Sequence, residues 1–164
     1  MSDKKTKYVA FLRGINVGGR KSVKMEVLRE VFGSLGFENV KTYIQSGNVL
    51  FETEKREDNE LAEKIEKAVE KEFFKTTVMV RSFDELREIV RRNPFASEDF
   101  NDKFFHVLFL REKLPEEKEE MLLSNNSRAE TFAVRNREIY CLLRDGTADS
   151  LLGKQYVDKK LNTP

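Results

Sequence analysis

The segment that decides the fold is residues 8–22, which read YVAFLRGINVGGRKS. Its first part, residues 8–12, is apolar on both faces of an extended chain, as expected of a central strand that is covered on both sides. A helical pattern begins near Val23, so the intervening loop joins a strand to a helix. Glycines allow backbone N–H groups to turn toward one point, and a helix start adds free donors and a positive dipole end. The loop therefore has the chemistry of an anion-binding cradle.

The composition limits the protein classes to consider. The chain has 164 residues, 39% hydrophobic and 36% charged, with a net charge of +1, which fits one domain or two small ones with a highly charged surface. The charge is uneven, because residues 1–24 hold seven Lys and Arg against one Asp. A single cysteine excludes an internal disulfide framework. No apolar run could span a membrane and no signal core is present, so the sequence predicts a cytoplasmic, bacterial-type protein without membrane contact.

The first half of the chain has the pattern of a ferredoxin-like unit. After the glycine loop, apolar residues recur at helical spacing between Ser22, the predicted N-cap, and Gly36, the predicted stop. The following predicted elements are strands at 39–45 and 48–53, a helix at 58–74 and a strand at 76–81. The order β-α-β-β-α-β is that of an antiparallel four-stranded sheet with two helices on one face.

The second half repeats this pattern without its last strand. Ser82 and Glu85 form a predicted capping box, which opens a helix that ends at Asn93-Pro94. The following predicted elements are a strand at 103–110, a helix from Pro115, strands at 130–135 and 137–143, and a helix at 150–161. We therefore predict an α+β protein of two ferredoxin-like halves, residues 1–81 and 82–164, with antiparallel sheets. The apolar faces of the first strand suggest that the open side of one sheet is covered, with the other half as a candidate.

The glycine loop does not fit a nucleotide-hydrolysing P-loop. Gly14 and Gly19 have the right separation, but Arg20 replaces the lysine, and Lys21-Ser22 comes one residue late. The predicted hairpins also differ from the parallel sheet of that fold. The sequence thus favours a simpler anion site, for which the candidates are Arg13, Asn16, Gly18, Gly19 and Arg20. The alternative is a wide turn whose cations are only solvated.

A nucleic-acid partner is the second hypothesis, because the ferredoxin-like sheet is also the RNA-recognition fold. The strand at 47–51 lacks the paired aromatics of the usual signature. Tyr8 and Tyr43 are the candidates for base stacking, with a role in the core as the alternative. Polar Gln45, Ser46 and Asn48 lie at the tip of the predicted hairpin, and the sequence leaves open at which end of the sheet this tip lies.

Metal and nucleophile chemistry have weaker support. His106 and Cys141 are the only residues of their types, and no motif spacing surrounds them, so we predict no metal site and no cofactor. Both lie in apolar strands, which favours a place in the core. Ser46 lacks the strand-to-helix elbow of a nucleophilic serine. The sequence names no catalytic residue, and whether the protein is an enzyme stays open.

Two motifs together resemble a known family. The stretches YVAFLRGINVGG at 8–19 and TYIQSGNV at 42–49 closely resemble the bacterial domain-of-unknown-function family 1697. Three later segments of this chain, namely Asn93-Pro94-Phe95, the strand 106–110 and the end 158–164, also resemble conserved segments of this family. The resemblance implies two ferredoxin-like halves and no particular activity. Members of the family usually continue past the equivalent of Pro164, so the resemblance also implies that a C-terminal tail is missing.

We therefore expect a monomer or weak dimer that binds an anionic ligand, either a phosphate-bearing metabolite, a nucleotide or a nucleic acid. The predicted site is the loop 13–20 with help from Gln45, Ser46 and Asn48. The alternatives are an enzyme acting on a phosphorylated substrate and a protein-interaction module. The latter would use the sheet edge of the second half, where the last strand is missing.

Overall fold

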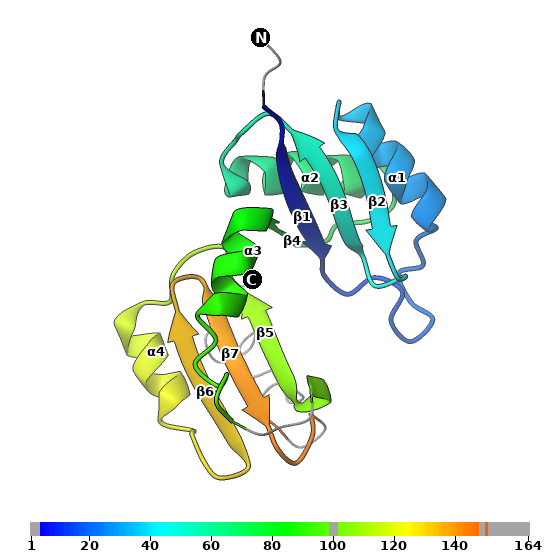
Figure 1. Ribbon diagram of the computed structural model, residues 1–164. Helices are drawn as coiled ribbons and strands as arrows, with labels where there is room; N and C mark the ends of the chain where they lie inside the picture. Colours follow the sequence, from blue (N-terminus) through cyan, green and yellow to red (C-terminus); the bar gives the residue numbers. More distant parts are fainter. Residues whose placement is uncertain (1–3, 99–101, 148–149, 151–164) are drawn as a thin grey trace. The chain divides into compact units, whose positions relative to one another are not determined.

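The computed structural model describes residues 4–98, 102–147 and 150, and its contacts divide the chain into two compact units, Met1–Glu88 and Ile89–Pro164 (Figure 1). This division lies within helix α3 (Phe83–Arg91). The division at residues 81 and 82 stays a prediction. No helix among the described residues has the length and apolarity that a membrane crossing requires.

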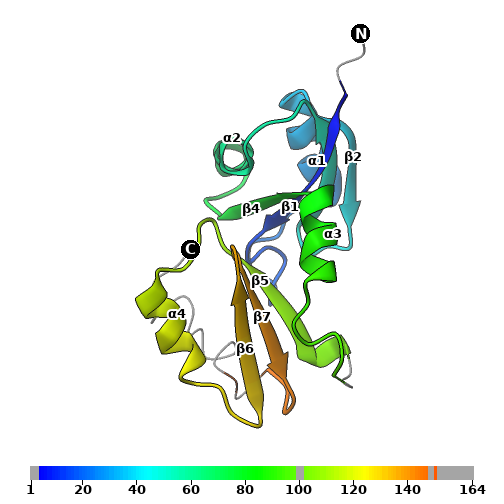
Figure 2. The ribbon, with the colours of Figure 1, turned by 60° about the vertical axis from the view of Figure 1, so that its left-hand side comes forward.

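The first unit contains one antiparallel sheet with two helices on one face (Figure 2). Its elements are β1 (Thr6–Leu12), α1 (Met25–Ser34), β2 (Glu38–Tyr43), β3 (Asn48–Thr53), α2 (Asp58–Glu72) and β4 (Val78–Ser82). The strand order is β2-β3-β1-β4, and each neighbouring pair is antiparallel. The predicted element order β-α-β-β-α-β is therefore the one observed in this unit.

Successive side chains along each strand point to opposite faces of the sheet, one covered by the helices and one open. Tyr8, Val49 and Phe51 lie on the covered face and are at most 1% exposed. They pack with apolar residues of the two helices, among them Leu28, Phe32, Leu61, Ile65 and Val69. A stacked pair of rings, Phe37 and Phe51, has centroids 4.5 Å apart in this core. On the open face Val9 is also buried, at 7% exposure, as the two apolar faces of β1 predicted.

The second unit contains a three-stranded antiparallel sheet in the order β5-β7-β6. Its elements are η1 (Asp102–Phe104), β5 (Phe105–Phe109), α4 (Glu116–Leu123), β6 (Glu130–Arg135) and β7 (Glu138–Leu143). The prediction of an α+β chain with two antiparallel sheets is thus confirmed. The predicted helix at 150–161 lies outside the described residues, apart from Ser150.

The predicted capping box at the start of α3 is confirmed. The Ser82 backbone N–H donates to Glu85 Oε2 at 2.8 Å, and the Glu85 backbone N–H donates to Ser82 Oγ at 3.2 Å. These reciprocal bonds satisfy donors that a helix start otherwise leaves without partners. The local sequence therefore fixes the point at which this helix begins.

Candidate functional site

The glycines of the loop form a tight turn. Gly18 and Gly19 have φ angles of +58° and +72°, and the Arg20 N–H donates to the Val17 carbonyl at 3.0 Å. Two successive residues with positive φ define the hairpin turn of type I′, in which glycine avoids the steric penalty. Among the described residues, neither glycine N–H donates a backbone hydrogen bond. These exposed donors remain available to solvent or to a ligand.

Asn16 holds the loop in place through its side chain. Its Nδ2 donates to the carbonyls of Gln45 at 2.8 Å and Val23 at 3.1 Å, and its Oδ1 accepts from the Val23 N–H at 2.8 Å. Its φ of +53° is one that asparagine tolerates better than most residues. Asn16 therefore positions the loop, and its amide is already engaged by backbone groups of the protein.

The turn between β2 and β3 lies against the glycine loop. The Leu12 N–H donates to the Gly47 carbonyl at 3.0 Å, and a Cβ at Gly47 would lie 2.6 Å from Ile15 Cδ1. Gln45 and Ser46 are exposed, and Asn48 donates to Ser46 Oγ at 3.2 Å. The structure thus places the turn 45–48 against the start of the glycine loop, through Leu12, Ile15 and Asn16, at the end of the sheet where β1 finishes and β3 begins (Figure 1).

We call these two segments the basic loop end, because their own sequences contain cations and no carboxylate side chain. It comprises residues 13–25 and 39–51, which contain no Asp or Glu and five cations, namely Arg13, Arg20, Lys21, Lys24 and Lys41. All five are exposed. Lys21 Nζ lies 5.3 Å from the centroid of the Phe74 ring, which orients this ammonium group through a cation–π contact.

The helix that follows the loop begins later than predicted. Ser22 is not its N-cap, because α1 starts at Met25 with Lys24 in the N-cap position and no side-chain cap. The bonds from Asn16 to Val23 keep the chain extended before the helix. The start of α1 at Met25 is therefore separated from the turn at Gly18 and Gly19 by residues 20–24.

An exposed apolar group accompanies the cations. Val17, Tyr43 and Ile44 are 64%, 65% and 62% exposed. Ile44 also has a φ of +48°, and a β-branched side chain makes this backbone conformation unfavourable. Strained backbone concentrates at functional sites, where the surrounding structure holds it in place. No pattern in the sequence marked Ile44 as a residue of this surface.

We expect Ile44→Asn to stabilise the protein by about 1 kcal/mol, because asparagine adopts the left-handed conformation at lower cost. The midpoint of thermal unfolding should rise by about 2–4 °C. Ile44→Thr, which keeps the β-branch, serves as the control and should give no such gain. A lower midpoint for Ile44→Asn than for Ile44→Thr would show that backbone strain at this position is not significant.

Among the other candidates of the sequence analysis, Tyr8 lies in the core of the first unit, and His106 and Cys141 lie in β5 and β7 of the second unit. Tyr8 is 1% exposed, and its hydroxyl exchanges hydrogen bonds with the Arg56 backbone, so Tyr8 is not available for stacking. Burial, helped by the charge of Glu130, raises the pKa of Cys141 to about 12, so this thiol is protonated at neutral pH. His106 is half-buried in β5. Among the described residues no group of three His, Cys, Asp or Glu could hold a metal ion.

Comparison with known proteins identifies the family. Residues 5–140 match the family described as "Protein of unknown function (DUF1697)". The chain belongs to this family. A solved structure, described as that of the conserved bacterial protein SP0830 from Streptococcus pneumoniae, is similar at 26% sequence identity with a TM-score of 0.74. The alignment covers 95% of this chain and 87% of that one. No protein with a curated description matches the chain.

Proposed function

We propose that this DUF1697 protein binds an anionic ligand at the basic loop end. The observation that carries the proposal is that two segments distant in sequence, joined by the Asn16–Gln45 bond of 2.8 Å, together contain five cations and no carboxylate. Such a local excess of positive over negative side chains is not expected from a chain with a net charge of only +1. A phosphate-bearing metabolite, a nucleotide or a nucleic acid has the charge that this surface would attract.

The ligand would be held mainly by side chains around the glycine turn. Arg13 and Arg20 carry planar guanidinium groups that can donate two parallel hydrogen bonds to a phosphate. The N–H groups of Gly18 and Gly19 add donors, and Gln45 and Ser46 supply polar groups from the neighbouring turn. Asn48 and Asn16 would hold other residues of the site in place and would not contact the ligand, since Asn48 bonds to Ser46 and Asn16 bonds to the backbone.

This function would rest on a ferredoxin-like scaffold. The strand order β2-β3-β1-β4, with all neighbours antiparallel, supports this fold for the first unit. In the second unit the order β5-β7-β6 has the same relation to the chain as β1-β3-β2. We therefore infer that both halves share one strand topology and that the basic loop end is a feature of the first half alone.

The test is a thermal-shift screen of the full chain with nucleoside phosphates, dinucleotides, sugar phosphates and short single-stranded DNA and RNA. A ligand at about a hundred times its dissociation constant stabilises the protein by roughly 2.7 kcal/mol. We expect at least one of these anions to raise the unfolding midpoint, less so at high salt. We expect Arg13→Ala/Arg20→Ala to weaken its binding at least about tenfold, because each arginine loses charge-assisted hydrogen bonds.

The matched control is Lys4→Ala/Lys55→Ala, which removes the same charge from the opposite end of the sheet. Lys4 precedes β1 and Lys55 follows β3, and Thr6 pairs with Thr53 at that end. This control should keep nearly full affinity. Equal affinity of both double variants, each checked for folding, would contradict the proposal.

A further inference from the structure

On the open face of the first sheet, residues of β2 and β3 that belong to the basic loop end form part of an uncovered strip. The strand register places one row of side chains across this face, from Tyr43 on β2 through Asn48 on β3 to Phe11 on β1. The next row runs from Lys41 through Leu50 to Val9, and Glu52 and Lys7 face each other in the row beyond. We call the part of these rows on β2 and β3, with Lys7, the sheet strip.

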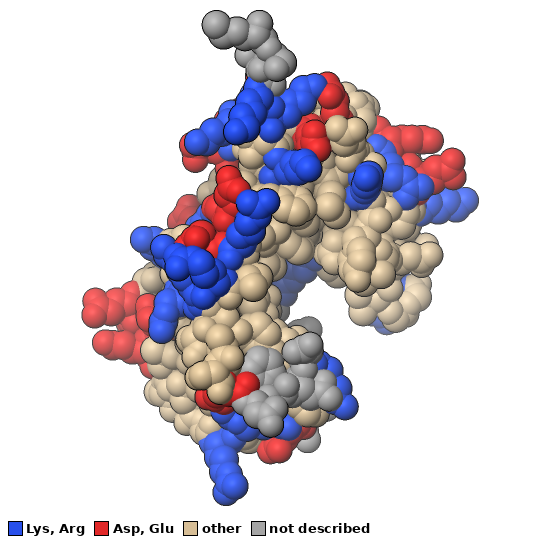
Figure 3. All heavy atoms as spheres, viewed as in Figure 1, with Lys and Arg blue, Asp and Glu red and all other residues tan. Residues whose placement is uncertain are grey.

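Exposure increases across this face toward β2. Arg81 and Met79 on β4 are 1% and 8% exposed, whereas Tyr43 on β2 is 65% exposed. Asn48 and Leu50 on β3 are half-buried, and Lys41 is exposed. Because β2 ends the described sheet, the strip is accessible from the edge. Seen from this side, basic and acidic side chains are interspersed on the first unit (Figure 3).

Tyr43 provides an aromatic surface in solvent. The structure gives its hydroxyl no hydrogen-bond partner among the described residues, and its ring is not part of the core. It lies two positions from Gln45, whose carbonyl accepts the bond from Asn16. The strand that carries this ring therefore leads into the turn that bonds to the glycine loop, and the exposed Ile44 and Val17 lie in this turn and in the loop. An exposed aromatic ring next to cations is the combination with which proteins bind single-stranded nucleic acids.

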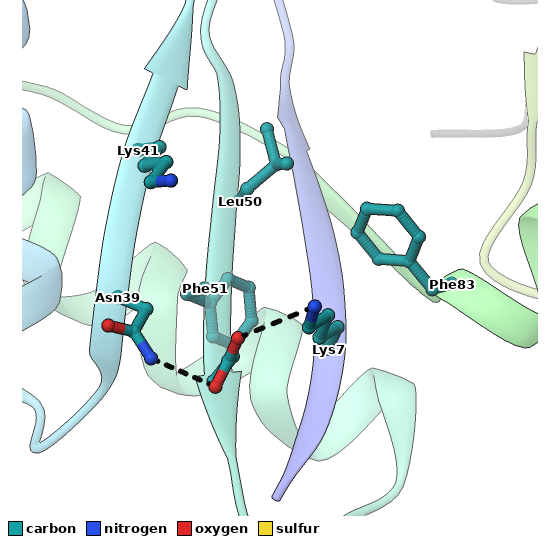
Figure 4. A pocket seen from close by; sticks show the side chains of 7 residues that line it. Lys7, Asn39, Lys41, Leu50, Phe51 and Phe83 are labelled. Carbon is teal, nitrogen blue, oxygen red and sulfur yellow. Dashed lines mark hydrogen bonds and ion pairs between the residues drawn. The ribbon is translucent and has the colours of Figure 1, made fainter.

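The strip also contains an open hollow of about 180 Å³ (Figure 4). Its lining includes Lys7, Lys41, Leu50 and Phe83. Its carboxylate, Glu52, is partly neutralised, because Asn39 Nδ2 donates to it at 3.0 Å and Lys7 Nζ lies 4.0 Å from it. Lys41 makes no ion pair among the described residues, so its ammonium group is available to a phosphate.

The size of this hollow helps to discriminate between ligands. Sites for small molecules are usually concave, with volumes of about 300–1,000 Å³. The hollow here is smaller and open, and the cations extend beyond it to the glycine loop. An extended ligand with several charges and several planar groups fits such a surface better than a compact metabolite does.

We propose that the ligand of the basic loop end is a single-stranded nucleic acid. This inference rests on the proposed anion-binding function and names its ligand class. The phosphates contact the loop at Arg13 and Arg20, one base stacks on Tyr43, and the strand continues over Lys41 toward the hollow. Stacking on a single aromatic ring tolerates any base, so we expect little sequence preference.

The experiment measures fluorescence anisotropy of labelled oligo(U) and oligo(dT), each of about twelve nucleotides, with the full chain. The comparison includes Tyr43→Ala, Tyr43→Phe and Arg13→Ala/Arg20→Ala. Wild-type protein should bind at least one of the two oligonucleotides, and its affinity should fall steeply between about 50 and 200 mM salt. Tyr43→Ala should lose about tenfold in affinity, whereas Tyr43→Phe, which keeps the ring, should bind like wild type.

Inorganic polyphosphate, added as an unlabelled competitor, separates stacking from charge. It should compete with the oligonucleotide less well than an unlabelled oligonucleotide with the same number of phosphates. Equal competition, or equal affinity of Tyr43→Ala and wild type, would overturn the nucleic-acid inference. If neither oligonucleotide binds but a nucleoside phosphate binds and is lost in Arg13→Ala/Arg20→Ala, this inference fails and the proposed function stands. If no anion binds, both fail.

Discussion

Gly47→Ala is expected to destabilise the first unit by about 3 kcal/mol, the largest effect of any single substitution considered for this protein. Two costs add. The φ of +84° is unfavourable for any residue with a Cβ. The new methyl group would also lie 2.6 Å and 2.8 Å from two carbons of Ile15 and 3.1 Å from Leu12 Cβ. Ile15 is only 2% exposed, so it has little room to move.

Gly36→Ala provides a matched control for this substitution. Gly36 lies in the same unit with the same φ of +84°, but nothing lies within 4 Å of the point that a Cβ would occupy there. We expect Gly36→Ala to cost only about 1 kcal/mol, the backbone part of the penalty. Urea denaturation of the two variants measures the difference. Equal losses would show that the turn moves away from the loop without cost, which would contradict the tight contact between them.

The second large effect is expected for Asn16→Ala, with a loss of about 2–3 kcal/mol. The substitution removes all three hydrogen bonds of the amide, which join the loop to Val23 and Gln45. It also leaves alanine in a left-handed conformation, at φ +53°. Val23 is only 4% exposed, so water replaces its two lost bonds incompletely, whereas water can replace the lost bond of the exposed Gln45.

Two further substitutions separate these contributions. Asn16→Asp keeps an acceptor for the Val23 N–H and loses both donor bonds. Its loss of stability should therefore be about half of that of Asn16→Ala. Asn16→Gly removes the bonds without the backbone penalty and should be less harmful than Asn16→Ala by about 1 kcal/mol. Denaturant unfolding of the three variants ranks them by their free energy of unfolding. A stability of Asn16→Ala within about 0.5 kcal/mol of wild type would contradict a clamping role for this side chain.

Both predictions bear on the proposed function, because Asn16 and Gly47 hold the two cationic segments together. Weakening this junction should separate the glycine loop from the turn that carries Gln45 and Ser46. Ligand affinity should therefore fall in Asn16→Ala even under conditions where the protein is folded. The thermal-shift screen measures this loss with the same anions as for the arginine variants.

Much of the local structure was predictable from the sequence alone. Apolar periodicity identified the strands and helices of the first unit, because each side chain faces the core at a fixed interval along a strand or helix. The capping box fixed the start of α3 through bonds between residues three positions apart. The prediction of a helix start at Ser22 is wrong, because the side chain of Asn16, six residues upstream, bonds to Val23 and keeps the chain extended there.

Only the tertiary structure decided how the candidate site is assembled. The sequence named the loop at 13–20 and the turn at 45–48 but did not place them at one end of the sheet, which depends on β3 pairing with β1. It likewise presented Tyr8 and Tyr43 as equivalent candidates, although the first is 1% and the second 65% exposed. The periodicity of apolar residues depends only on residues that are close in sequence. Strand order and the covered face of a sheet depend on contacts between residues far apart in the chain.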